Sequence, residues 1–146
     1  MTERVLVPFD GSPAARRAVE YAHNRFPESK LTLLYVIDPM VDYSRQRAYP
    51  GYTQEDEFRN EREKAEHVLE SVLDTLPDEA SVDTAIEAGS PAQTIIQFAT
   101  DNDASQIVIG GHGKQGVARF LLGSVAEAVV RRSAVPVTVV RPTGNE

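Results

Sequence analysis

The residues best suited to chemistry form a glycine-rich loop between an apolar run and a helix-forming segment. Gly110 and Gly113 are followed, after nine residues, by Gly123 and Ser124. Glycine lets a backbone approach phosphate oxygens closely and exposes its amides. A helix that begins near Ser124 adds free N–H groups and the positive end of its dipole, which bind anions. This spacing predicts a phosphate-binding loop, to which the Ser124 hydroxyl can add a hydrogen bond.

Two other phosphate-binding motifs compete for the same loop, and both fail. The glycines from Gly111 onward have the spacing of a dinucleotide fingerprint, but the expected helix begins too late and Pro136 stands where the acid should be. The phosphate loop of nucleotide triphosphatases requires Ser or Thr after Gly-Lys, and Gln115 stands there instead. The longer arrangement therefore remains as the interpretation of this loop.

Two basic residues, Lys114 and Arg119, lie within the loop. The whole chain is acidic, with 15 Lys and Arg against 22 Asp and Glu and a formal net charge of −7. An acidic protein needs bases beside a polyphosphate, so we expect both side chains to hold one. The same net charge argues against a nucleic-acid-binding protein, because nucleic-acid backbones are bound by a concentrated positive surface.

The elements that must position this loop alternate regularly along the chain. Apolar runs predict strands at residues 4–9, 31–37, 106–109 and 135–140. Residues 81–87 alternate polar and apolar side chains, which predicts a half-exposed strand near a sheet edge. N-cap residues, first-turn prolines and apolar stripes predict helices at residues 14–25, 53–76, 90–100 and 124–132. Strict strand–helix alternation predicts an α/β fold in one domain, residues 1–146, with a five-stranded parallel sheet covered by helices on both faces.

One segment, residues 38–53, has no clear period and carries three tyrosines. An unpatterned loop of that length is often a functional flap. A mobile insertion without a function of its own explains the pattern equally well. The helix after it is expected to begin with a capping box at Thr53.

The remaining candidate residues follow the first two strands. Ligands of open parallel sheets bind beyond the carboxyl ends of the strands, where the strand order reverses. Pro8, Phe9 and Asp10 end the first strand, and Val36 lies near the end of the second. Asp10 either caps the next helix or faces a ligand. A bare carboxylate repels phosphate, so the second role implies contact with ribose or with a bridging Mg²⁺.

At these residues the chain resembles the universal stress protein family over nearly its whole length. The resemblance rests on Pro8, Asp10 and Val36, on the glycine signature, and on the closing run at residues 134–140. In that family the glycine signature marks the members that bind ATP. The resemblance therefore implies an ATP-binding protein with a Rossmann-like sheet, similar to that of adenine nucleotide alpha hydrolases, in the strand order 3-2-1-4-5.

The resemblance also implies a role for each site residue. Pro8, Phe9 and Asp10 would line the nucleotide pocket, and Val36 would touch adenine or ribose. The residues implied to hold ribose and phosphates are Gly110, His112, Gly113, Gly123, Ser124 and Val125. Gly111 departs from the family pattern, which often has a small hydroxyl residue there; this change removes one possible contact but leaves the backbone scheme intact.

Two classes of function compete for this pocket. The favoured one is a nucleotide-binding module of the stress response, with no catalytic residue and no metal site of its own. The alternative is a slow ATPase or nucleotide hydrolase, which the absence of a clear general base disfavours. Ser124 and Glu127 have the spacing of a capping box, a role that is compatible with phosphate binding.

The sequence also allows expectations about partners and location. In the family's strand order the final strand, Pro136 to Val140, lies at a sheet edge. Its outward backbone groups can pair with those of a second copy, so we expect a homodimer through this strand. No apolar run approaches the roughly 20 residues of a membrane-spanning helix. With no signal-peptide pattern at the start and no cysteine, we expect a cytoplasmic protein without membrane partners.

Overall fold

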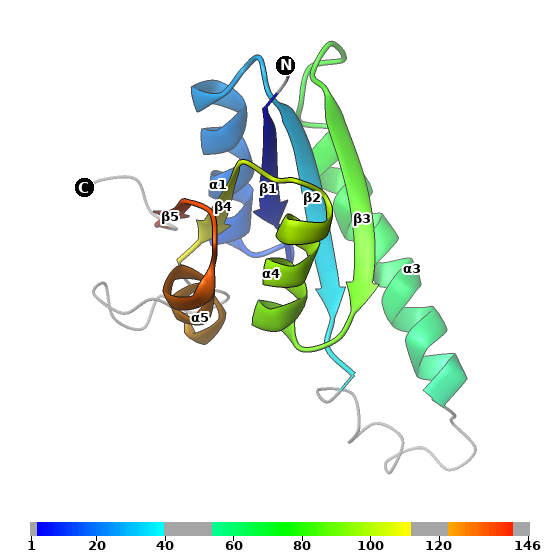
Figure 1. Cartoon of the computed structure of the whole chain (residues 1–146). Helices are drawn as coiled ribbons and strands as arrows, with labels where there is room; N and C mark the ends of the chain where they lie inside the picture. Colours follow the sequence, from blue (N-terminus) through cyan, green and yellow to red (C-terminus); the bar gives the residue numbers. More distant parts are fainter. Residues whose placement is uncertain (1–2, 40–53, 112–122, 142–146) are drawn as a thin grey trace.

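Five parallel strands form one sheet in the order β3-β2-β1-β4-β5, which confirms the predicted fold and strand order (Figure 1). The computed structural model describes residues 3–39, 54–111 and 123–141, with side chains from residue 58 onward in the second range. The strands are β1 (Arg4–Pro8), β2 (Lys30–Ile37), β3 (Val82–Ala88), β4 (Gln106–Gly110) and β5 (Val137–Val140). The helices are α1 (Pro13–Arg25), α3 (Gln54–Leu73), α4 (Pro91–Asp101) and α5 (Ser124–Arg132).

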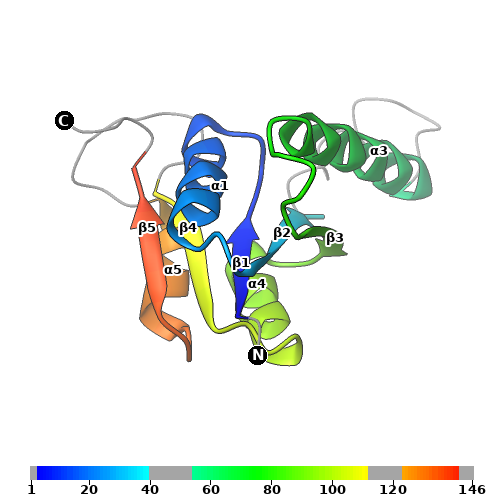
Figure 2. The same cartoon turned by 90° about the horizontal axis from the view of Figure 1, so that it is seen from above.

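The helices form a layer on each face of the sheet. Viewed from above, α1 and α3 cover one face, and α4 and α5 cover the other (Figure 2). Each helix buries small or aliphatic residues against the sheet, as Ala18 and Val19 of α1 and Val129 of α5 do. None of the described helices is both long and apolar enough to cross a bilayer.

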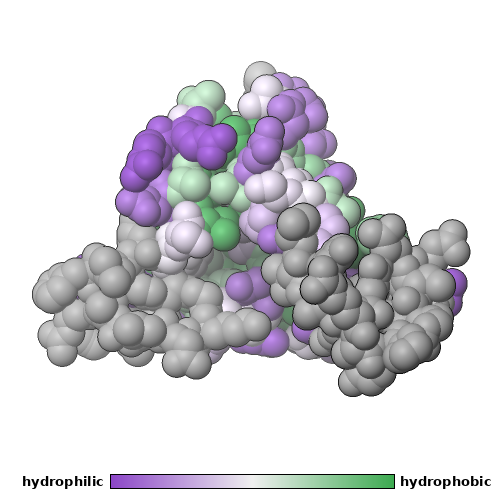
Figure 3. Space-filling view, turned by 90° about the horizontal axis from the view of Figure 1, so that it is seen from below, coloured by the Kyte–Doolittle hydropathy of each residue, from purple (hydrophilic) through white to green (hydrophobic). Residues whose placement is uncertain are grey.

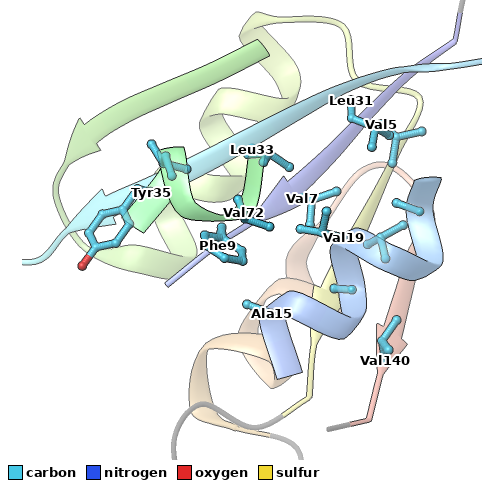
Figure 4. Close-up of a cluster of buried hydrophobic side chains, with 14 of the residues drawn as sticks. Val5, Val7, Phe9, Ala15, Val19, Leu31, Leu33, Tyr35, Val72 and Val140 are labelled. Atoms are coloured by element: carbon cyan, nitrogen blue, oxygen red, sulfur yellow. The ribbon is translucent and has the colours of Figure 1, made fainter. Parts of the chain in front are cut away.

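Two hydrophobic clusters, one on each face, hold these layers together. The first packs β1 and β2 against α1 and α3 and includes Val7, Phe9, Leu33 and Val72 (Figure 4). The second packs the other face against α4 and α5. Leu6, Leu34, Ile95, Ala99, Ile107, Ile109, Ala126 and Val129 form its buried part. Apolar residues buried on both faces of the sheet explain the continuous apolar runs of β1 and β4.

The predicted and observed ends of the elements agree to within three residues, and both ends of α5 coincide. α3 ends at Leu73 rather than near Leu76, because the amides of Thr75 and Leu76 bond three residues back and tighten the last turn. β5 begins at Val137, although the carbonyl of Pro136 already accepts a bond from β4. β3 is an edge strand, as its alternating pattern predicted.

Part of the sequence interpretation falls on residues that the structure does not describe. Residues 40–53, which hold most of the predicted flap and the Thr53 cap, lie outside the described residues. So do residues 112–122, which contain the middle of the glycine loop.

Candidate functional site

A cleft of about 270 Å³ lies at the carboxyl ends of the central strands. Its position matches the point where the strand order reverses, because β1 pairs with β2 on one side and with β4 on the other. The view onto this end of the molecule shows both hydrophobic and hydrophilic surface between the grey atoms (Figure 3). The described lining residues are Pro8, Phe9, Asp10, Ser12, Ala15, Leu34, Val36, Pro91, Ile95, Ile109, Gly110, Gly123, Ser124, Val125 and Ala126.

One side of the cleft is apolar. Leu34 and Val36 come from β2, Ile109 comes from β4, and Ile95 comes from α4. All four belong to, or pack against, the second hydrophobic cluster. Such a wall suits a flat, weakly polar group such as a nucleobase, because transfer of the faces of the base out of water lowers the free energy.

Another part of the lining is the start of α5, where several backbone donors lie close together. Gly123 is the N-cap residue, and the first helical bond runs from the amide of Glu127 to the Gly123 carbonyl at 2.9 Å. The N–H groups of Ser124, Val125 and Ala126 precede that bond, so they have no acceptor within the helix. All three residues line the cleft. Together with the helix dipole they favour an anionic group.

The glycine loop is closed at its base by backbone hydrogen bonds. The Gly123 amide donates to the Gly111 carbonyl, and the Gly111 amide donates to the carbonyl of Val140. These bonds tie the end of β4 to both the start of α5 and the end of β5. They therefore hold the first and last glycines of the signature at one cleft.

The capping-box interpretation of Ser124 is wrong. Ser124 is the first residue of the helix rather than its N-cap, and Gly123 takes the cap position. The Glu127 carboxylate accepts a bond from Arg131 at 2.9 Å, one turn further along the helix. The exposed Ser124 side chain is thus not used as a cap among the described residues, and it lies beside the free amides.

The loop after β1 brings Asp10 to the cleft and fixes its carboxylate. One Asp10 oxygen accepts the backbone N–H of Ser12 at 2.9 Å. Ser12 is the N-cap of α1, and its hydroxyl accepts the Ala15 amide at 3.1 Å. Gly11 lies between them with φ +84°, a conformation that favours glycine. Ser12 rather than Asp10 caps α1, so the predicted capping role of Asp10 is wrong. Its carboxylate stabilises the turn that leads into α1 and lines the cleft, and its contact with a ligand stays a prediction.

Phe9 fixes the position of the loop after β1 through its backbone and its ring. Its amide donates to the Leu34 carbonyl at 2.8 Å, and its ring is buried in the first cluster (Figure 4). The Arg16 guanidinium lies 5.7 Å from the centre of the ring and donates to the Ser71 hydroxyl of α3. These contacts hold the Phe9 backbone rigidly at the cleft.

The structure brings eight of the predicted site residues together at the cleft, and their binding roles stay predictions. They are Pro8, Phe9, Asp10, Val36, Gly110, Gly123, Ser124 and Val125. The other four, His112, Gly113, Lys114 and Arg119, lie outside the described residues. Among those described, no group of three or more His, Asp or Glu side chains is placed to hold a metal ion.

Sequence reasoning missed several lining residues. Ser12 and Ala15 of the α1 start, Leu34, Ile109 and Ala126 were not predicted, nor were Pro91 and Ile95 of α4. A signal for Pro91 was present, because it follows the third strand after only two residues. The rule that ligands bind at the carboxyl ends of strands therefore applies to it as well.

Comparison with known proteins agrees with this architecture. The model of the universal stress protein family matches residues 1–141. Two proteins of Methanocaldococcus jannaschii are similar to the chain. Universal stress protein MJ0531 is 30% identical over 99% of this chain and 85% of its own length. Universal stress protein MJ0577 is 31% identical over 97% of this chain and 96% of its own.

Solved structures share the fold. The structure of MJ0577 superposes with a TM-score of 0.83 and 29% identity, over 100% of this chain and 99% of that one. A universal stress protein in complex with cAMP has a TM-score of 0.60 and 24% identity, over 97% and 98% of the two chains. An Arabidopsis thaliana protein of the family with AMP bound has a TM-score of 0.68 and 20% identity, over 97% and 93%. The chain belongs to the universal stress protein family.

Proposed function

We propose that this protein is an ATP-binding regulatory module of the stress response, with the nucleotide in the cleft at the carboxyl end of the sheet. The observation that carries the proposal is the start of α5. The amides of Ser124, Val125 and Ala126 lack acceptors within the helix and line the same cleft as the predicted residues of β1 and β2. A polyphosphate offers the acceptors that such donors require.

The shape of the cleft supports an adenine nucleotide as the ligand. Its apolar wall suits a base, and the backbone donors at the start of α5 suit phosphates. The fold accommodates such ligands, because two proteins that share it were solved with cAMP and with AMP. The base would lie beside Val36, with the ribose near Asp10 and the phosphates along Gly123 and Ser124.

Charge balance supports a role for groups beyond the described cleft. Asp10 is the one acidic side chain among the described lining residues, and it disfavours phosphate unless a cation intervenes. Mg²⁺ in nucleotide sites usually takes one or two carboxylates and completes its shell with phosphates and water. A Mg²⁺ ion carried by the triphosphate would therefore find a ligand in Asp10, while Lys114 and Arg119 would neutralise the remaining charge.

Two measurements on purified protein test this proposal. Mass spectrometry of the ligand released from freshly purified protein is expected to identify an adenine nucleotide. A phosphate-release assay is expected to show no turnover above the rate of nucleotide alone, because the proposal assigns binding rather than hydrolysis. Measurable turnover that is lost in Asp10→Asn would replace the binding module with an ATPase.

A homodimer through β5 belongs to the same proposal. β5 is an edge strand. The Pro136 carbonyl accepts the Ile107 amide of β4, and the Val140 carbonyl accepts the amide of Gly111, which follows β4. Alternate residues of a parallel strand bond to the same neighbour, so Val137 and Val139 direct their N–H and C=O groups away from β4. Pairing of two such edges about a twofold axis would satisfy both backbones.

A further inference from the structure

β3 forms the second edge of the sheet, and one side of its backbone has no neighbouring strand among the described residues (Figure 2). The strand pairs with β2 over all seven of its residues. Just outside its ends, the Ser81 carbonyl accepts the Leu31 amide, and the Gly89 amide donates to the Ile37 carbonyl. These bonds fix which backbone groups of β3 bond to β2.

Residues of a parallel strand alternate between its two neighbours, so the residues between Ser81 and Gly89 divide into two sets. Asp83, Ala85 and Glu87 bond to β2. The outward set directs its N–H and C=O groups away from the sheet and consists of Val82, Thr84, Ile86 and Ala88. No proline interrupts this set. An uninterrupted row of outward backbone groups is a template for one more strand.

Beside this row lies a groove of about 480 Å³ between β3 and α3. Leu69 and Leu73 of α3 and Ile86 of β3 give it an apolar floor. The side chain of Thr84 is exposed along the groove. Alternate side chains of an added strand would point into this groove, where they could bury apolar surface.

Among the side chains named around this edge, acidic ones outnumber basic ones. Two cations near this edge form ion pairs: Arg62 lies 3.7 Å from Glu66, and Lys30 lies 2.8 Å from Asp83. Among the described residues, Glu70 of α3 and Glu87 of β3 form no ion pair. Glu70 lies on the groove side. Glu87 and Ala85 also line the groove, but strand alternation directs their side chains to the other face, where Ala85 packs against the second cluster.

We propose that the outward edge of β3 binds an extended, lysine- or arginine-rich segment of a partner protein as an added strand. The backbone groups of the outward set supply the hydrogen bonds, and the groove takes the apolar side chains. With its apolar side chains in the groove, the segment places its bases on the opposite face, beside Glu87. In the other register the bases lie beside Glu70. A second copy of this chain fits poorly, because it would bring the same unpaired acids together.

Amide hydrogen exchange of the full chain, followed by NMR, tests this proposal. The probe is a capped seven-residue peptide of alternating lysine and valine, and its control has glutamate in place of lysine. With the lysine peptide, exchange at the four outward amides is expected to slow at least tenfold. The amides of Asp83, Ala85 and Glu87 already bond to β2, so their exchange is expected not to change. Equal effects of both peptides, or no effect of either, would overturn the proposal.

A matched pair of variants separates backbone pairing from side-chain contact. Thr84→Pro removes an outward donor without touching the bonds to β2, and such prolines are tolerated on edge strands. It is expected to weaken binding of the lysine peptide at least tenfold, whereas Thr84→Val, which keeps the N–H group, is expected to leave it unchanged. Equal binding by the two variants would contradict strand addition.

A charge reversal keeps the proposal testable if the proline variant does not fold. Both side chains are exposed, so Glu70→Lys with Glu87→Lys is expected to fold and to transfer the preference to the glutamate peptide. An unchanged preference would exclude charge as the basis of selection. Protection of the outward amides without peptide, rising with protein concentration, would show that a second copy is the occupant and would overturn the proposed partner.

Discussion

Gly110, the first glycine of the loop signature, lies directly against the backbone of Ala14 in α1. A Cβ atom built on Gly110 would lie 2.7 Å from the Ala14 carbonyl carbon and 2.9 Å from its oxygen. Real Cβ atoms do not approach backbone this closely, so α1 could not keep its position. Gly110 also lines the cleft, so this close packing of α1 against β4 lies at the edge of the candidate site.

We predict that Gly110→Ala destabilises the protein even without ligand. The added methyl group meets backbone rather than a movable side chain, so the expected loss is about 1–3 kcal/mol in the free energy of unfolding. Urea unfolding of the ligand-free protein measures it. Ala14→Gly in the same chain is expected not to restore stability, because the backbone contacts at Ala14 remain. A stable single variant would show that α1 can shift without cost.

The two serines that precede helices are predicted to differ in their effect on stability. The Ser12 hydroxyl caps α1 by accepting the Ala15 amide, whereas Ser90 makes no side-chain cap bond to α4. Ser12→Ala is therefore expected to cost about 1 kcal/mol, and Ser90→Ala less than about 0.5 kcal/mol. Thermal unfolding of both variants provides the comparison. Equal losses would contradict the different roles of the two hydroxyls.

The fold was predictable because local signals and long-range packing agree. Residues 5–8 of β1 and 107–109 of β4 are continuous apolar runs because both of their faces are buried. Ser12-Pro13 starts α1 at the predicted place, since a cap and a first-turn proline act within one turn. The strand order came from the family resemblance, because alternation of elements alone fixes a parallel sheet but not the sequence of neighbours within it.

The site was predictable only in part, because some of its features arise from contacts between distant segments. The sequence indicates that Gly110 frees the backbone for a ligand, but only the approach of α1 reveals its packing role. Likewise, Ser124 and Glu127 have the spacing of a capping box. In the structure the Gly123 amide donates to the Gly111 carbonyl, and Gly123, one residue before Ser124, is the N-cap. Ile95 of α4 belongs to the apolar wall of the cleft. The apolar stripe of that helix predicts that Ile95 is buried, but it does not indicate that Ile95 lines a binding site.

Replacement of Gly123 by valine is predicted to weaken ATP binding at least tenfold, or about 1.4 kcal/mol. The new side chain would lie at the start of α5, where the free amides line the cleft, and would crowd the phosphates. Gly113→Val is expected to act in the same way, although Gly113 lies outside the described residues. Calorimetric titration with ATP measures both affinities.

Stability serves as the control for these glycine variants. The backbone of Gly123 has φ −63° and ψ 159°, which a valine can adopt, so the variant is expected to fold. Valine is a poorer N-cap than glycine, and a small loss of helix stability is therefore expected in the absence of ATP. Wild-type affinity in both folded variants would contradict the assignment of the glycine loop to phosphate binding.

The proposed dimer is predicted to depend on the outward backbone of β5. Val139→Pro removes an N–H group that faces away from β4, so it should prevent pairing of two β5 edges while leaving the sheet intact. Val139→Ala keeps that donor and loses a similar amount of packing against the second cluster. Sedimentation is expected to show monomers for the proline variant and dimers for the alanine variant. A wild-type protein that is monomeric at micromolar concentration would contradict the dimer.

The central claim is that an adenine nucleotide binds where α5 begins, and a chemical-shift titration of the nucleotide-free protein with Mg²⁺ and ATP tests it most directly. The largest changes are expected at the amides of Ser124, Val125 and Ala126, with smaller ones at Phe9 and Asp10. The α1–α3 face, for example Glu20 and Thr75, is expected to remain unchanged. The absence of shifts at saturating ATP, or shifts confined to that face, would contradict the account.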